Sequence, residues 1–290
     1  MIDCIVDANS MFARAYFAVT GQHPGAPVEE SLEAAVQSAL FTLGNLGERP
    51  DRVLFCFDDQ AKKDKGRSPK PESFGTCLAR YEELLPKIVG GRMVRMTGYE
   101  ADDVVATAAF DSLSERVYVV SGDKDLHQLQ SDRVSIYDLN TKGVLSRHTI
   151  LARWNVKRPA QSAIALAILG DPRDNIPGIK GWGPKKVAKL FEQVSPSMGF
   201  EEALHAIEQQ IPEALKAEFY TCLELTLLNI SIPGVPDPAP FQVCGMDDLY
   251  ELGFGALEPT WTRLTGPGGV RRLNEHRESR AGSLIDRLGV

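Results

Sequence analysis

Acidic residues recur at or just beyond the ends of short apolar runs in this sequence. They are Asp7, Asp58, Glu100, Asp102, Asp103, Asp123, Asp125, Asp171 and Asp174. Carboxylates gathered at one place repel each other unless cations lie between them, and their hard oxygen atoms favour Mg²⁺ or Mn²⁺. Two such ions, about 3.5–4 Å apart, can stabilise the attacking and leaving oxygens of a phosphoryl displacement. The pattern predicts a two-metal site that hydrolyses phosphodiesters.

A simpler explanation exists for some of these acids. Acidic side chains favour the first turn of a helix, where the helix dipole is positive. Glu100, Asp102 and Asp103 open a helical pattern, so each of them alone could be a capping residue. That explanation does not extend to acids that follow several successive strands. The sequence contains no GxSxG motif and its five histidines are scattered, so we expect no nucleophilic side chain.

The elements that must position these acids alternate along the first half of the chain. Apolar runs of strand length cover residues 2–6, 53–57 and 117–120, with a weaker candidate at 92–96. Helical patterns lie between them, at residues 31–46, 74–88 and 101–113. Buried strands that alternate with helices predict an α/β fold with a mostly parallel central sheet flanked by helices. Ligands of such sheets bind beyond the carboxyl ends of the strands, where the acids are expected.

The second half of the chain changes to helices joined by short turns. Helical patterns cover residues 147–154, 159–169, 185–193, 201–209 and 212–230, and a proline-rich connection follows at 231–240. We therefore predict a catalytic domain over residues 1–145 and a helical subdomain over 146–235. Residues 236–290 form a C-terminal extension whose structure the sequence does not indicate.

A glycine-rich turn at residues 178–186 precedes one of these helices. Glycines allow a backbone to approach a phosphate closely, the N–H groups of a helix N-terminus point toward it, and proline suits the first helical position. The turn predicts a helix–hairpin–helix that grips a DNA backbone without reading its sequence. Its expected DNA-binding residues are Gly178, Lys180, Gly181, Trp182, Gly183, Lys185 and Lys186. A plain glycine-rich turn is the alternative, and Trp182 could equally be buried in the hairpin.

A basic run follows Asp58 at residues 62–70. A charge run is usually a solvated loop, but this one would lie at the mouth of the acidic site. We expect Lys62 and Lys63 to contact DNA, and Lys65 and Arg67 to stabilise charge in the transition state.

Composition agrees with a soluble, DNA-directed protein. The net charge of −7 argues against nucleic acid, but setting aside the nine acids leaves 30 acids against 32 bases. No apolar run could span a bilayer, and acids stand at the N-terminus where a signal peptide carries bases. The five cysteines show no CxxC spacing, so neither a zinc site nor a disulfide framework is expected. We expect a cytoplasmic monomer with no membrane partner.

Taken together, the motifs resemble the 5′-nuclease family, which includes the N-terminal domain of bacterial DNA polymerase I, phage 5′–3′ exonucleases and flap endonucleases. The matching stretches are Ile5-Val6-Asp7 with Arg14-Ala15-Tyr16, Phe57-Asp58, and residues 98–103, 121–125 and 170–178. They follow the family's order, with similar spacing, from residue 1 to about residue 235. No polymerase domain follows, so the resemblance indicates a stand-alone member from a bacterium or a phage-infected host.

The resemblance implies a PIN-like nuclease fold, two metal sites and cleavage of DNA near a 5′ end or a flap. It assigns Asp7, Asp58, Glu100, Asp102 and Asp103 to one ion, and Asp123, Asp125, Asp171 and Asp174 to the other. It places Arg14 with Lys65 and Arg67 among the catalytic residues. It also implies a K⁺ ion held by carbonyl groups of the hairpin.

One stretch departs from the family's pattern. The segment after Phe57-Asp58 is several residues shorter than usual, and its Tyr-Lys-x-x-Arg run keeps only Arg67. Lys63 replaces the tyrosine, and Asp64 replaces the lysine, with Lys65 one place on. The choice between exonuclease and flap activity therefore stays open. Two further alternatives are a non-catalytic DNA-binding module and a ribonuclease that acts on RNA or an RNA–DNA hybrid.

Overall fold

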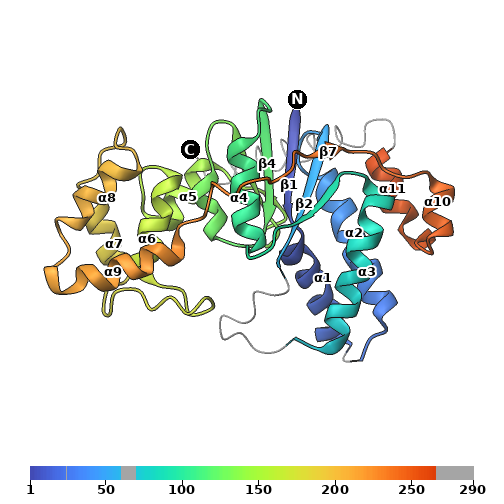
Figure 1. Cartoon of the computed structure of the whole chain (residues 1–290), viewed down its shortest axis with the longest axis horizontal. Coiled ribbons are helices and arrows are strands. Elements are labelled where there is room, and N and C mark those ends of the chain that lie inside the picture. Colours follow the sequence, from blue (N-terminus) through green and yellow to red (C-terminus); the bar gives the residue numbers. More distant parts are fainter. Residues whose placement is uncertain (24, 60–69, 266–290) are drawn as a thin grey trace, which may run out of the picture.

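The structure is a computed structural model that describes residues 1–23, 25–59 and 70–265. Its described strands form one sheet in the order β3-β2-β1-β4-β5-β6, with β7 beside β2 (Figure 1). The parallel strands are β1 (Ile2–Asp7), β2 (Arg52–Phe57), β3 (Arg92–Arg95), β4 (Arg116–Ser121) and β5 (Val134–Asp138). β6 (Gly143–Val144) and β7 (Ala239–Pro240) pair antiparallel to their neighbours. The predicted mostly parallel sheet is confirmed.

Each face of the sheet carries its own hydrophobic core, because successive side chains of a strand point to opposite faces. Val6 and Phe55 face helices α1 (Ala8–Gln22), α2 (Val28–Gly44) and α3 (Glu72–Val89). Ile5 and Leu54 face α4 (Ala101–Asp111) and the helical half of the chain. The strands are therefore buried on both sides, which explains their continuous apolar runs.

The helical half lies beyond α4 on the left of Figure 1. It contains α5 (Arg147–Trp154), α6 (Ser162–Leu169), α7 (Pro184–Phe191), α8 (Phe200–Glu208) and α9 (Glu213–Thr226), together with the 3₁₀ turn η2 (Pro159–Gln161). The 3₁₀ turn η1 (Asp125–Leu129) belongs to the sheet half, between β4 and β5. The buried side chains of the helical half belong to the same core as one face of the sheet, so no core boundary falls near residue 145. Within the described residues, no helix is both long and apolar enough to cross a membrane.

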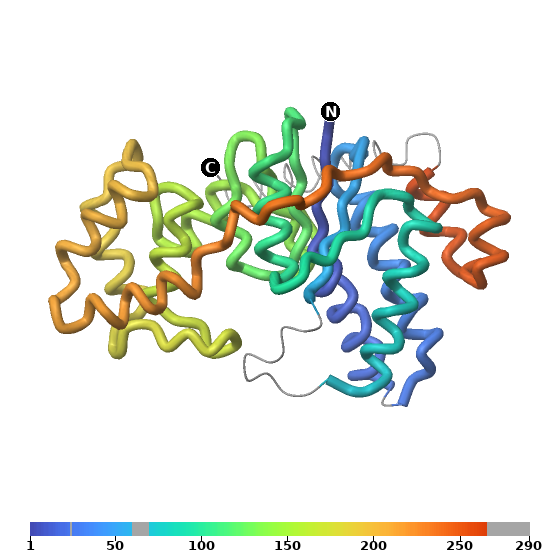
Figure 2. Tube along the Cα trace, viewed as in Figure 1, coloured from blue at the N-terminus to red at the C-terminus, as the bar shows by residue number. Residues whose placement is uncertain are grey.

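The segment after α9 returns to the sheet. The predicted helix over 212–230 ends at Thr226, and the chain then runs extended to add β7 to the edge of β2 (Figure 2). Helices α10 (Met246–Glu251) and α11 (Glu258–Thr265) follow, with the turn η3 (Gly255–Leu257) between them. Leu264 is buried in the core beneath α2, and Trp261 donates a hydrogen bond to the Cys244 carbonyl at 2.9 Å. Residues up to 265 of the C-terminal extension thus pack against the sheet domain.

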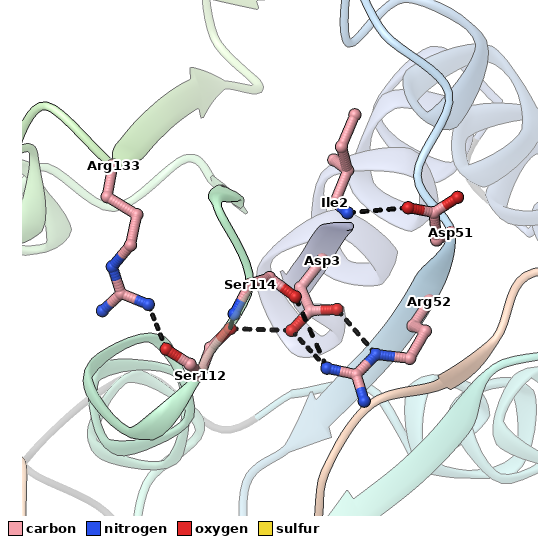
Figure 3. A network of polar contacts seen from close by, with 7 residues as sticks. All are labelled: Ile2, Asp3, Asp51, Arg52, Ser112, Ser114 and Arg133. Atoms are coloured by element: carbon pink, nitrogen blue, oxygen red, sulfur yellow. Dashed lines mark hydrogen bonds and ion pairs between the residues drawn. The ribbon is translucent and has the colours of Figure 1, made fainter.

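A buried ion pair fixes the amino end of the sheet. Asp3 on β1 is fully buried and accepts two hydrogen bonds of 2.8 Å from Arg52 on β2 (Figure 3). Ser112, which follows α4, donates a third at 2.7 Å. Arg133 in turn donates to the Ser112 carbonyl. Burial by itself would raise the pKa of Asp3, but the hydrogen bonds from Arg52 and Ser112 outweigh it and lower the pKa.

We expect Asp3→Ala to lower the free energy of unfolding by about 3 kcal/mol, because it leaves the Arg52 guanidinium without its buried partner. A carboxylate with a lowered pKa stabilises the fold above its ordinary value of 3.8 and loses that contribution as pH falls below it. The difference between wild type and variant in urea denaturation should therefore shrink below about pH 4.

Glu48→Ala is the matched control, since Glu48 pairs with Arg116 on the exposed surface. Its cost should stay under about 1 kcal/mol. Equal losses in the two variants would show that the Asp3 network does not stabilise the sheet.

Candidate metal centre

Two adjoining cavities open at the carboxyl ends of β1, β2 and β4. The smaller, about 250 Å³, is lined by the carboxylates of Asp7, Asp58, Glu100, Asp102 and Asp123. The larger, about 530 Å³, is lined by those of Glu100, Asp102, Asp103, Asp123, Asp125 and Asp174, and also by Glu224. Glu100, Asp102 and Asp123 line both. The structure thus brings eight of the nine acids singled out in the sequence to one edge of the sheet.

Asp7 ends β1 and caps the N-terminus of α1. Its carboxylate accepts hydrogen bonds from the Ser10 backbone at 2.9 Å and from the Ser121 hydroxyl at 2.7 Å. Burial raises the pKa of Asp7 to about 7, and the nearby carboxylates of Asp58 and Asp123 add to the rise. Ser121, which ends β4, was not among the residues predicted from the sequence.

Asp58 follows β2 and is held by two groups. The Asn9 side-chain amide donates to one carboxylate oxygen at 2.5 Å, and the Ala101 backbone N–H donates to the other at 2.9 Å. Ala101 is the first residue of α4, whose N–H groups lack partners within the helix. Sequence reasoning missed Asn9, and its only local signal is a place in the helix turn that follows Asp7.

Glu100, Asp102 and Asp103 begin α4 as the sequence pattern indicated. Glu100 is the N-cap residue, and Asp102 and Asp103 lie in the first turn. All three line the larger cavity, so a position at the helix N-terminus is compatible with a place in the site. Burial raises the pKa of Asp102 well above its usual value, and the neighbouring Asp103 and Glu100 raise it further. Asp103 accepts a hydrogen bond from the Asn229 backbone at 2.9 Å.

Asp123 and Asp125 lie on the turn that follows β4. The Asp123 carboxylate accepts a hydrogen bond from the Asp125 backbone at 2.9 Å. The Oδ1 atom of Asp125 is buried and has no hydrogen-bond partner in the described part of the chain. Burial raises the pKa of Asp125 to about 7, and the charges of Asp123 and Asp174 raise it further. An orphaned carboxylate oxygen among other carboxylates is a place where a hard divalent cation fits.

The carboxylates line the cavities without closing around a point. Across residues 1–23, 25–59 and 70–265, no three Asp, Glu, His or Cys side chains are grouped closely enough to hold one ion as they stand. The donor set nevertheless consists of carboxylate oxygens, which suits Mg²⁺ or Mn²⁺. The division of these ligands between two ions stays a prediction.

Asp171 is the one acid that lines neither cavity. It is 3% exposed, and Lys124 contacts its carboxylate at 2.5 Å while the Arg173 backbone donates to it at 3.0 Å. Burial alone would raise the pKa of Asp171, but the hydrogen bond from Lys124 lowers it. Lys124, in the middle of the Asp123-Lys124-Asp125 motif, was not predicted as a site residue.

The predicted hairpin joins α6 to α7. Gly170 and Gly178 both have positive φ, +75° and +65°, and their backbones touch. A Cβ atom on Gly170 would lie 2.6 Å from the Ile176 carbonyl oxygen. Asp171 and Ile176 form a bridge that closes the loop. Gly178, predicted to bind DNA, is buried and shapes the loop.

The outer part of the hairpin presents the remaining predicted DNA contacts. Lys180, Gly181 and Lys185 are exposed, and Gly183 caps α7 with Pro184 in the first helical position. Trp182 is half-buried and packs against the core, with the Lys186 ammonium 4.5 Å from its ring centre. The structure therefore places Trp182 in the body of the hairpin.

Of the predicted basic residues, the structure describes Arg14 but not those of the run after Asp58 up to residue 69. Lys62, Lys63, Lys65 and Arg67 lie outside the described residues. Lys70, the last base of the run, lines the smaller acidic cavity and lies 4.5 Å from the Phe74 ring centre. Arg14 is exposed on α1 and donates to Asn140 at 2.6 Å. It lines a neighbouring apolar cavity of about 780 Å³, between α1 and α2, and neither acidic cavity.

Comparison with known proteins agrees with this arrangement. The family model of the 5′-3′ exonuclease N-terminal resolvase-like domain matches residues 3–155. This chain belongs to the 5′-3′ exonuclease family. The resemblance inferred from the motifs and the predicted enzyme family are confirmed.

Relatives of this exonuclease-family chain include the thermostable DNA polymerase I of Thermus thermophilus, 32% identical over 256 residues. That match covers 82% of this chain but 29% of the polymerase. The 5′-3′ exonuclease of Aquifex aeolicus is 27% identical over 235 residues, 77% of this chain and 80% of the relative. The solved T5 5′-exonuclease with bound zinc aligns over 95% of this chain and 98% of its own, with a TM-score of 0.55 at 18% identity. The last comparison confirms the predicted fold class.

For this exonuclease-family protein, we expect Asn9→Ala to weaken the binding of Mn²⁺ by about tenfold, because the Asp58 carboxylate loses the amide that orients it. Isothermal titration calorimetry on the full chain measures the affinity. Asn45→Ala is the control, since Asn45 bonds only within the end of α2, to the Phe41 carbonyl. An affinity that Asn9→Ala leaves unchanged would mean that Asp58 needs no such support.

A second expectation concerns the hairpin. Gly170→Ala should lower the free energy of unfolding by about 3 kcal/mol, because it combines a left-handed backbone with a clash against the Ile176 carbonyl. Gly75→Ala, in open space on α3, should be neutral or stabilise the protein by up to about 1 kcal/mol. Thermal unfolding compares the two variants, and a tolerated Gly170→Ala would contradict the close approach of the two glycines.

Proposed function

We propose that this chain is a divalent-metal-dependent, structure-selective 5′ nuclease that hydrolyses DNA phosphodiesters. The observation that carries the proposal is that eight of the nine acids singled out in the sequence line two adjoining cavities at the carboxyl edge of the sheet. Membership of the 5′-3′ exonuclease family supports it. Because the chain spans 29% of the polymerase relatives, their polymerase activity is not carried over.

We assign two Mg²⁺ or Mn²⁺ ions to the carboxylates that line these two adjoining cavities. Asp7, Asp58, Glu100, Asp102 and Asp103 are proposed for the first ion, and Asp123, Asp125 and Asp174 for the second. Asp171 would join the second set only if its contact with Lys124 breaks, and otherwise it holds Lys124 beside the turn. The orphaned Oδ1 atom of Asp125 supports the second site.

Bound ions would polarise the scissile phosphodiester and neutralise the charge that develops on it. The chain's own residues position the ligands: Ser121 orients Asp7, and Asn9 orients Asp58. Lys70 lies at the smaller cavity, where an ammonium group can contact a substrate phosphate. Lys65 and Arg67 are proposed to stabilise the transition state, and Arg14 is proposed to contact the substrate beside the site.

The hairpin is proposed to bind the DNA backbone through Lys180 and Lys185, beside the N-terminus of α7, where the helix dipole is positive. A K⁺ ion held by its carbonyl groups would add positive charge at the same place. A T5 flap endonuclease of the same fold has been solved with DNA and metal ions, at a TM-score of 0.56 and 17% identity. We further propose a monomer that acts in the cytoplasm of a bacterium or a phage-infected host.

The test is cleavage of a 5′-labelled flap duplex with Mg²⁺ or with EDTA, by wild type and Asp123→Ala. We expect metal-dependent cleavage that falls at least about a hundredfold in Asp123→Ala. The length of the product separates flap cutting from stepwise exonuclease action. Asp132→Ala is the control, because Asp132 is a fully exposed surface acid, and it should cleave like wild type.

An intact substrate in every lane, with binding still visible by gel shift, would favour the non-catalytic DNA-binding module. The lack of a closed ligand cluster among the described residues is the observation behind that alternative. Faster cleavage of an RNA or RNA–DNA version of the same flap would favour the ribonuclease alternative.

A further inference from the structure

The larger acidic cavity has one wall that does not come from the sheet domain. Residues 224–228, at the end of α9 and just after it, line this cavity together with the carboxylates. We call residues 224–229 the wall segment. Thr226 within it is buried and donates a hydrogen bond to the Ala163 carbonyl of α6 at 3.1 Å. Because α6 leads directly into the hairpin, the wall segment is tied to the proposed DNA-binding element.

Polar side chains of the sheet domain hold this wall segment from the other side. Thr107 on α4 donates to the Asn229 carbonyl at 3.0 Å and accepts from the Ile232 backbone at 3.3 Å. Asp103 accepts from the Asn229 backbone at 2.9 Å. These bonds fix the far end of the wall segment to the same helix whose first turn carries Asp102 and Asp103.

Gln128 on η1 joins the wall segment to the carboxylates themselves. Its side-chain nitrogen donates to the Asp125 carbonyl at 2.8 Å and to the Thr226 carbonyl at 3.0 Å. Its side-chain oxygen accepts from the Leu228 backbone at 3.5 Å. One amide group therefore joins the turn that carries Asp125 to the wall segment. Only an amide side chain can donate twice and accept once in this way.

We propose that Gln128 is a positioning residue that couples the helix–hairpin–helix to the divalent-ion site. It holds the Asp125 backbone and the wall segment in register, and it touches neither the ions nor the substrate. This inference rests on the proposed two-metal function. Loss of the amide leaves the exposed lysines of the hairpin unchanged, so duplex binding should persist while ion binding weakens.

The test uses Gln128→Met, which keeps the size of the side chain and its neutral charge but removes the three hydrogen bonds. Mn²⁺ binding to the full chain without DNA is measured by isothermal titration calorimetry, and duplex binding by gel shift in EDTA. We expect the Mn²⁺ dissociation constant to rise about tenfold. The turnover number should fall, while the KM for the flap duplex changes by less than about twofold.

Gln130→Met is the matched control. Gln130 lies directly after the same turn, and within the described residues its side-chain amide donates to the adjacent Ser131 carbonyl alone, at 3.3 Å. The Mn²⁺ affinity of Gln130→Met should stay within about twofold of wild type. Equal losses of Mn²⁺ affinity in Gln130→Met and Gln128→Met would mean that any change near the turn loosens it, and that result would overturn the proposal.

Thr107→Val tests the same coupling from α4. Valine is nearly isosteric with threonine but cannot make the hydrogen bond to the Asn229 carbonyl. We expect the Mn²⁺ dissociation constant to rise at least about threefold. In the double variant with Gln128→Met the two effects should be less than multiplicative, because both side chains restrain one segment. Should Gln128→Met fail to fold, Thr107→Val alone decides.

The positioning role is overturned if Gln128→Met folds and keeps an Mn²⁺ affinity within about twofold of wild type. If Gln128→Met does not fold, the same result for Thr107→Val overturns it. Wild-type protein that binds no Mn²⁺ at all would instead bring down the proposed two-metal function, so the two failures are distinguishable.

Discussion

The burial of neighbouring carboxylates at the carboxyl ends of β1, β2 and β4 is the constraint on which the rest of this structure depends. Asp7 and Asp125 are held so far from water, and so near other acids, that their pKa values rise to about 7. Their surroundings offer backbone N–H groups and a serine hydroxyl but too few donors for every oxygen. Buried carboxylates of this kind are neutralised either by protons or by hard cations. The metal-dependent chemistry of the family relies on neutralisation by cations.

The amino end of β1 also carries a buried acid, Asp3, whose charge is stabilised in a different way from that of Asp7 at the carboxyl end. Asp3 is as deeply buried as Asp7, yet the Arg52 guanidinium and the Ser112 hydroxyl hold its pKa below the usual value (Figure 3). Asp3, which serves the fold, is therefore neutralised by a cation that the protein itself supplies. Asp171 belongs with Asp3 in this respect, because Lys124 neutralises it.

The helical half completes the cavity as well as presenting the hairpin. The wall segment at the end of α9, held by Thr107 and Gln128, lines the larger cavity together with carboxylates of the sheet domain. The common core beneath α4 makes the two halves one packed unit. The elements that carry the hairpin and the elements that carry the carboxylates are therefore packed on the same core. The return of the chain to β2 through β7 closes that unit.

The sequence by itself determined the alternation of strands and helices, the acids beyond the strand ends and the hairpin, because these depend on local periodicity and on residue types at short spacing. It did not indicate Asn9, Lys124 or Gln128 as supports, nor that Asp171 turns away from the cavities. Asn9 and Asp58 are 49 residues apart, and Gln128 and Thr226 are 98 apart. Contacts of that kind exist only after the whole chain has packed, since hydrophobic periodicity records which face of an element is buried but not which polar group will meet it there.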